Sequence, residues 1–119
     1  MELHRAGEDY LKAVLILQKQ SGSARSKDIS DLLRVSRASV SNAMKLLRDG
    51  GFVTIDPKKR IRLTDVSREI AERVLERHSV VSAFLRSLGV APDVADADAC
   101  RMEHIISTQS FECMRDRLR

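Results

Sequence analysis

The sequence has only two cysteines and contains no run of 18 apolar residues. A membrane-spanning helix needs about 18 or more such residues in a row, so no transmembrane span is predicted. The first residues lack a basic region followed by an apolar stretch, and no secretory signal is expected. Cys100 and Cys113 do not predict a disulfide scaffold, so we expect a reducing, cytoplasmic location in which the thiols bind metal or pack.

Signatures of enzymes are also missing from the sequence. The helical His-Glu-x-x-His pattern of catalytic zinc sites does not occur, and neither does a phosphate-binding loop or a Ser-His-Asp order. A metallohydrolase is therefore a weak alternative, and no small organic substrate is expected.

Charge is divided unevenly along the chain. Residues 1–63 carry 13 Lys/Arg against 7 Asp/Glu, a net +6, whereas residues 64–119 carry 8 against 10, a net −2. A basic front half suits a module that binds a polyanion, joined to a segment with another role. A charge excess of this size is also common where it only promotes solubility.

The front half predicts a winged helix-turn-helix over residues 1–63. Ser26 and Ser36 are expected to cap the second and third helices, Leu32 and Leu33 to face inward, and a Gly-Gly pair to end the third helix. Two short β-branched runs flank the basic turn Asp56–Arg60 and predict the wing. The expected elements are helices over 8–20, 27–34 and 37–49 and strands over 52–55 and 61–63.

The rear half, residues 64–119, predicts a second, helical domain, which makes the chain mostly α. Apolar residues at three- and four-residue intervals indicate helices from about 64 to 88, from 93 to 107 and from 109 to the end. The last helix has Phe111, Met114 and Leu118 as its apolar stripe, and Cys113 is expected to pack beside them.

The third helix is expected to read DNA, because small polar residues near the N-terminus of a recognition helix reach base edges and phosphates. Asn42 can pair with adenine, and basic wing residues would meet the sugar-phosphate backbone. A solvated face is the alternative for any one of these residues; the order of helices and wing favours DNA. The candidates are Arg37, Ala38, Ser39, Ser41, Asn42, Lys45, Lys58, Lys59 and Arg60.

A possible metal site lies near residue 100. On a helix, Cys100, Glu103 and His104 would project from one face, and together they offer three ligands for a first-row divalent metal. Asp9 and His78 are candidates to complete the ligand set. A packed cysteine, a solvated glutamate and hydrogen-bonded histidines are the alternative.

Several motifs are spread over essentially the whole chain. They are Glu8-Asp9-Tyr10-Leu11, Val35-Ser36 with Ser39-Val40-Ser41, Leu63-Thr64, Arg77-His78 with Phe84-Leu85, and Ala99-Cys100-Arg101-Met102-Glu103-His104. Together they resemble the diphtheria toxin repressor family of iron- and manganese-dependent regulators, and the last motif is the most specific. The resemblance implies a homodimer that binds a palindromic operator when metal is plentiful. It also implies the two-domain form, without the SH3-like domain of longer members.

The resemblance implies ligands from two branches of that family. Cys100, Glu103 and His104 match the iron-responsive branch, Asp9 matches an aspartate ligand of the manganese branch, and His78 matches a histidine used in both.

Three positions depart from the family patterns. Lys12 replaces a carboxylate of the manganese branch, and Ser82 and Asp96 replace a glutamate and a histidine of the ancillary site in the iron branch. One good metal site per subunit is therefore expected.

The donor atoms narrow the choice of metal. A thiolate favours Fe²⁺, Co²⁺, Ni²⁺ or Zn²⁺ over Mn²⁺ by intrinsic affinity, and availability in the cell then points to Fe²⁺; the Asp9 carboxylate keeps Mn²⁺ as the second choice. A metal bound by Asp9 and the rear ligands would act as co-repressor by fixing the DNA-competent conformation. Two alternatives stay open: a winged-helix regulator whose rear helices only dimerise, and a protein-interaction module.

Overall fold

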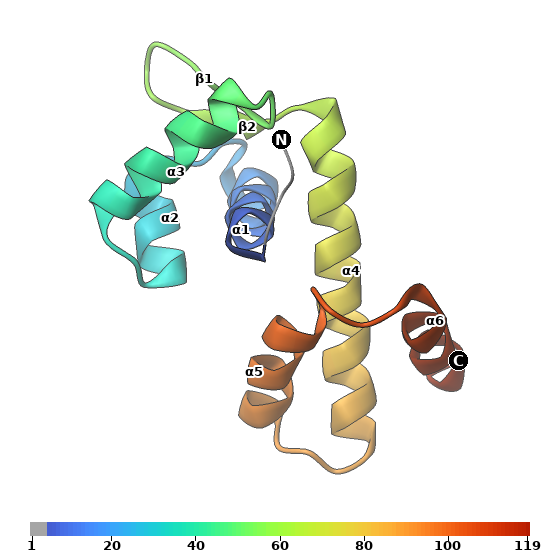
Figure 1. The fold of residues 1–119 in the computed structure, drawn as a ribbon. Helices are drawn as coiled ribbons and strands as arrows, with labels where there is room; N and C mark the ends of the chain where they lie inside the picture. The colour runs from blue at the N-terminus through green and yellow to red at the C-terminus, as the bar shows by residue number, and fades with distance from the viewer. Residues whose placement is uncertain (1–4) are drawn as a thin grey trace. The chain divides into compact units, whose positions relative to one another are not determined.

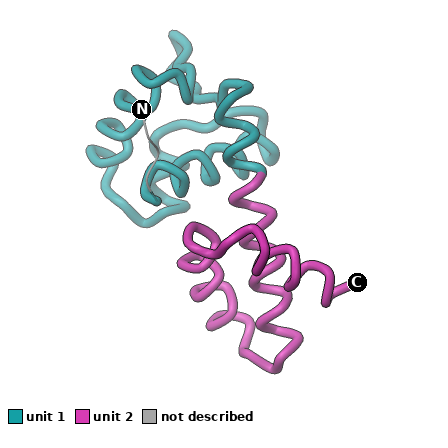
Figure 2. Tube along the Cα trace, turned by 45° about the vertical axis from the view of Figure 1, so that its right-hand side comes forward, with its two compact units in different colours: residues 1–72 teal, residues 73–119 magenta. Residues whose placement is uncertain are grey.

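The computed structural model describes residues 5–119. The chain divides into two compact units, residues 1–72 and residues 73–119 (Figure 2). Among the described residues, no helix is both long and apolar enough to cross a bilayer.

Unit 1 is a winged helix-turn-helix, as the sequence predicted (Figure 1). Its strands pair antiparallel, with Val53 opposite Leu63 and Ile55 opposite Ile61. Ala24 adds a short bridge to the sheet, donating to Ile61 O at 3.1 Å and accepting from Ile61 N at 2.6 Å. The elements are α1 (Arg5–Ser21), α2 (Ser26–Leu33), α3 (Arg37–Asp49), β1 (Val53–Ile55), β2 (Ile61–Leu63) and the first residues of α4 (Asp65–Ser87).

Helix α3 begins and ends at the predicted residues, and a capping serine and a glycine beside its ends explain why. Ser36 caps the helix, its Oγ accepting from Ser39 N at 3.1 Å. After the helix, Gly51 adopts φ +81°, a left-handed conformation that glycine takes without steric cost. This lets Phe52 N donate back to Leu47 O at 2.8 Å, the Schellman arrangement that satisfies carbonyls at a helix end.

Helix α2 differs from expectation in two details. Its N-cap is Arg25 rather than Ser26, because the Asp28 carboxylate accepts from Arg25 N at 3.3 Å and starts the helix one residue earlier. Leu32 is 45% exposed, whereas Ile29 is fully buried. Leu32 lies about 60° around the helix from Ile29 and Leu33 only about 40°, so Leu33 stays nearer the buried face.

The core of unit 1 is formed by apolar side chains from α1, α2, α3, both strands, the short connections beside them and the start of α4. Helix α1 packs against α2, α3 and β2, and α3 packs against β1. The buried apolar residues are Leu11, Ala13, Val14, Leu15, Ala24, Ile29, Val40, Met44, Leu47, Phe52, Val53, Ile61, Leu63 and Ala71. This core holds α3 and the wing in fixed positions within the unit.

Unit 2 contains the rest of α4, α5 (Pro92–Met102) and α6 (Thr108–Arg117). Ala95 and Ala99 on α5 are fully buried, and the buried Ser82 on α4 donates a hydrogen bond to Asp96 on α5. Helix α5 ends five residues before the predicted end at 107. The amides of Ile105 and Ile106 both donate to Met102 O at 3.1 Å, which turns the chain after the helix.

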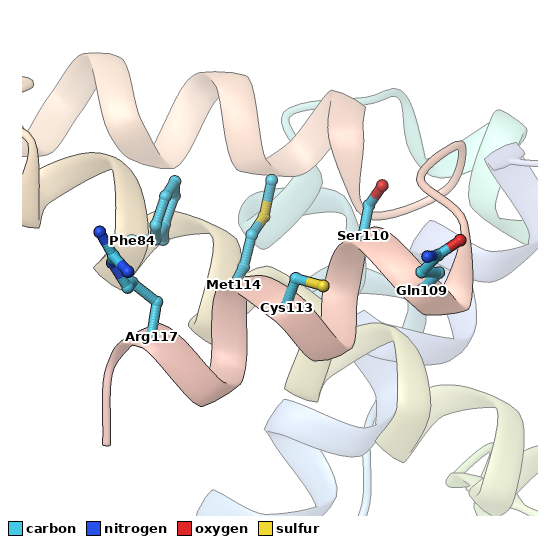
Figure 3. A pocket seen from close by; sticks show the side chains of 6 residues that line it. All are labelled: Phe84, Gln109, Ser110, Cys113, Met114 and Arg117. Carbon is cyan, nitrogen blue, oxygen red and sulfur yellow. The ribbon is translucent and has the colours of Figure 1, made fainter.

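The prediction that Cys113 packs in the apolar stripe of α6 is wrong. Cys113 is exposed and lines an open groove with Phe84, Met114 and Arg117 (Figure 3). The inward residue of α6 is Phe111, which is 7% exposed. The guanidinium of Arg115, one turn later, lies 5.5 Å from the centre of the Phe111 ring and covers it.

Candidate DNA interface and metal centre

A basic hollow in unit 1 is the candidate DNA interface. Three elements form it: the start of α2, the start of α3 and the tip of the wing. Of the predicted DNA-binding residues, the structure brings Arg37, Ser41, Lys58 and Lys59 together at this hollow. Its other lining residues are Arg25, Ser26 and Lys27.

The residues at the start of α2 were missed by the sequence reasoning. Arg25 and Lys27 flank the first residue of the helix, and the signal was present as two basic residues at a helix start. Helix N-termini present free backbone amides to anions, and cations there add to phosphate affinity. The hollow therefore holds five cations suited to a DNA backbone.

The remaining predicted residues lie outside the hollow. Ala38, Ser39, Asn42 and Lys45 are exposed on α3, as base or phosphate contacts require. Arg60 is half-buried, and its Nε donates to Asp56 Oδ2 at 2.7 Å. Arg60 thus closes the wing turn, and its guanidinium is partly engaged within the protein.

The Asp56 carboxylate organises the wing tip. Its Oδ1 accepts from the amides of Lys58 and Arg60, both at 2.9 Å. The hydrogen bond from the Arg60 amide, with further bonds and charge from Arg60 and Lys58, lowers the pKa of Asp56 below its ordinary value of 3.8. These bonds hold the two lysines that line the hollow.

The lowered pKa of Asp56 gives a prediction for the wing. A carboxylate with a lowered folded-state pKa stabilises the fold above pH 3.8, and this contribution disappears as pH falls through the folded-state value. In an NMR titration we expect the Asp56 carboxyl to titrate below 3.8. The chemical shifts of the Lys58 and Arg60 amides should change with pH at the same midpoint as the Asp56 carboxyl. In the Asp56→Asn variant these amide shifts should no longer change at that pH. A carboxyl midpoint above 3.8 would contradict the arrangement.

In unit 2, Glu103 is the centre of a cluster of possible metal ligands. Its side chain has no exposed surface, and His78 Nδ1 lies 2.8 Å from Glu103 Oε2. His104 Nε2 lies 3.3 Å from Glu103 Oε1. Cys100 Sγ lies 3.7 Å from His78 Nδ1. Four of the five predicted ligands therefore gather in this unit, from α4, α5 and the turn after α5.

The donor set of this cluster fits a divalent transition metal. One thiol, one carboxylate and two imidazoles are sulfur, oxygen and nitrogen donors of the kind that bind first-row metals. A buried carboxylate is costly unless it is paired or binds a metal. Asp9, the fifth predicted ligand, lies on α1 in unit 1, and its participation remains a prediction.

Ser82 and Asp96, which depart from the ancillary-site pattern of the iron branch, are hydrogen-bonded to each other. Ser82 Oγ offers only a hydroxyl and donates it to Asp96 Oδ1, while His78 Nδ1 is directed to Glu103. Lys12, on α1 in unit 1, is only 9% exposed. That each subunit has one good metal site stays a prediction.

A winged helix-turn-helix with a basic hollow, together with a helical unit that gathers thiol, carboxylate and imidazole groups, defines a DNA-binding regulator that uses a metal. Comparison with known proteins gives the family. Residues 2–61 match the iron dependent repressor N-terminal DNA binding domain, and residues 64–119 match the iron dependent repressor metal binding and dimerisation domain. The chain belongs to the iron dependent repressor family of metal-dependent transcriptional regulators, which are not enzymes.

The individual relatives are transcriptional regulators, and one of them is described as manganese-dependent. The transcriptional regulator MntR of Escherichia coli is 34% identical over 116 residues, covering 96% of this chain and 75% of MntR. The crystal structure of IdeR from T. acidophilum is 26% identical with a TM-score of 0.82, covering 99% of this chain and 55% of IdeR. A solved manganese-dependent transcriptional repressor in complex with manganese is 26% identical with a TM-score of 0.83. The match covers 94% of this chain and 52% of the repressor chain. The chain spans about half the length of these two solved chains.

Proposed function

We propose that this protein is a transcriptional repressor that binds operator DNA as a homodimer, with Fe²⁺ as its co-repressor and Mn²⁺ as the second choice. The observation that carries the proposal is the buried Glu103 carboxylate between two imidazoles, with the Cys100 thiol beside one of them. When bound, the metal supplies positive charge and fixed coordination directions among these donors.

The choice of Fe²⁺ rests on Cys100. A thiolate is a softer donor than a carboxylate, and Mn²⁺ prefers oxygen and nitrogen donors. Asp9 is a proposed carboxylate ligand, and it argues for Mn²⁺ as the alternative. The ligand set we propose is Asp9, His78, Cys100, Glu103 and His104.

The DNA part of the proposal rests on the basic hollow and α3. The proposed contacts are Arg37, Ala38, Ser39, Ser41, Asn42, Lys45, Lys58, Lys59 and Arg60, and we add Arg25 and Lys27. Phosphate contacts would position the DNA-binding unit on the duplex, while Asn42 and its neighbours would contact base edges. In a dimer the two recognition helices must lie about 34 Å apart to enter successive major grooves. Because the two subunits are related by two-fold symmetry, the proposed operator is palindromic.

We also propose that the chain has two functional domains: residues 1–63 bind DNA, and residues 64–119 bind metal and form the dimer. Metal would then act as a ligand that favours the DNA-competent state, an effect typically worth about 5- to 150-fold in affinity.

An anaerobic titration tests the proposed function. Duplexes that bind are first enriched from a random-sequence pool with Fe²⁺-loaded protein. We expect chelation to weaken binding to them by about 5- to 150-fold, and one Fe²⁺ per subunit to restore it at a lower concentration than Mn²⁺. The double variant Cys100→Ala/His104→Ala should bind the duplex as weakly with metal as without it. If it binds as tightly as the unmodified protein, the rear helices serve dimerisation only, and the metal proposal fails.

A further inference from the structure

The turn between α5 and α6 holds two of the proposed metal ligands, Glu103 and His104, outside regular secondary structure. At its start, the amides of Ile105 and Ile106 share the carbonyl of Met102. Ile105 is 78% exposed and adds no buried anchor. Glu103 and His104 bury their side chains at the start of the turn, so it is the second half of the turn, from residue 105 on, whose position depends on contacts from elsewhere in unit 2.

Arg77 on α4 supplies such contacts. Its Nη1 donates to Ile106 O at 2.7 Å, and its Nη2 is 3.3 Å from Thr108 Oγ1. The same guanidinium lies 5.6 Å from the centre of the Phe111 ring. One side chain thus joins the end of the turn, the first residue of α6 and the buried aromatic ring to α4.

The neighbouring residue on α4, His78, contacts the beginning of the same turn, through Glu103 at 2.8 Å. Consecutive helical residues point about 100° apart, so Arg77 and His78 reach two separate parts of one turn. We propose that Arg77 is a positioning residue for the metal centre: its two hydrogen bonds set where the Glu103–His104 turn lies against His78. This inference rests on the proposed metal-binding function.

The chemistry of the contact requires arginine. A guanidinium donates from a rigid planar fork and stacks on an aromatic face, whereas a lysine ammonium is a point charge that cannot do both. Lysine at position 77 would keep the charge and lose the fixed geometry. Methionine would keep the length and lose every donor.

Arg115 provides a matched control. It lies over the same ring, 5.5 Å from its centre against 5.6 Å for Arg77, but it belongs to α6. Arg115→Met removes a cation from Phe111 and leaves the Ile106 and Thr108 bonds in place. Arg77→Met removes both.

The test is anaerobic Co²⁺ binding to the full chain, followed by the thiolate-to-cobalt and ligand-field absorption bands. Loss of an outer hydrogen-bond partner of a metal site typically costs about 10- to 100-fold in affinity, and we expect about tenfold for Arg77→Met. Its ligand-field bands should shift because the ligands are displaced. Arg77→Lys should be intermediate, and Arg115→Met should bind Co²⁺ like the unmodified protein. Thermal midpoints of the metal-free variants measure the purely structural effect.

Equal Co²⁺ affinities and spectra for Arg77→Met and Arg115→Met would overturn the positioning role while leaving the metal centre intact. Absence of thiolate-to-cobalt bands in the unmodified protein would instead remove the proposed centre, and this inference with it. If Arg77→Met does not fold, Arg77→Lys decides: unchanged affinity and bands in that variant contradict the proposal.

Discussion

Replacement of Glu103 by glutamine is expected to weaken Fe²⁺ or Co²⁺ binding by more than about 100-fold, because even outer hydrogen-bond partners of metal sites are worth about 10- to 100-fold. Glu103 is the fully buried residue that contacts both imidazoles. Glutamine keeps the volume and the capacity to bond His78, but it removes the negative charge that a divalent cation needs. Metal titration with duplex DNA present should show the same loss in metal-activated DNA binding.

Glu112→Gln is the matched control for this experiment. Glu112 is exposed on α6, in the same unit, and its replacement makes the same change in charge. We expect metal affinity within twofold of the unmodified protein. A Glu103→Gln variant that is folded, as judged by circular dichroism, and still binds metal tightly would show that this carboxylate is not a ligand.

The triple variant Arg37→Ala/Lys58→Ala/Lys59→Ala is expected to lose a large part of the salt sensitivity of DNA binding. Each phosphate contact contributes about 0.9 to the slope of log affinity against log salt, so the loss of three contacts in each subunit of the proposed homodimer should lower the slope by about 5.4. Between 50 and 200 mM salt the unmodified protein would then lose about 2,000-fold more affinity than the variant. Fluorescence anisotropy with a labelled duplex at several salt concentrations measures both slopes.

A second triple variant separates local contacts from net charge. Lys19, Arg73 and Arg86 are exposed and lie outside the hollow, and their replacement by alanine removes the same charge. We expect its slope to stay within one unit of that of the unmodified protein. Equal slopes for the two triple variants would mean that DNA responds to overall charge and not to the hollow.

The parts of the fold that the sequence predicted best are those with local signals. The bounds of α3 follow from the Ser36 cap and the glycine after the helix, both within a few residues of its ends. The end of α5 has no such signal, since neither glycine nor proline occurs between Met102 and Ser107. Contacts in the following turn, including the bond from Arg77 to Ile106, join residues far apart in sequence, and periodicity cannot reveal them.

In the candidate sites, too, the sequence predicted local features but not contacts between residues that lie far apart in the chain. The prediction that Cys100, Glu103 and His104 share one helix is wrong for the last two, which follow the end of α5. Their spacing also could not show that His78, 25 positions before Glu103, contacts that carboxylate. Arg25 and Lys27 join the hollow only once α2, α3 and the wing are packed. Cys113 was misplaced because it is close to Phe111 in sequence but about 200° around the helix from it, so it points away from the buried ring.

The bridge between Ala24 and Ile61 has a consequence for how DNA would be bound. It joins the chain just before Arg25 to the chain just after Arg60, with bonds of 3.1 and 2.6 Å. Backbone hydrogen bonds thereby hold the start of α2 and the wing, which form two sides of the hollow, at a fixed distance. A phosphate would meet cations whose spacing is already set. Little ordering entropy remains to be lost by this unit on binding, so the preset spacing would strengthen phosphate contacts with duplexes of any sequence.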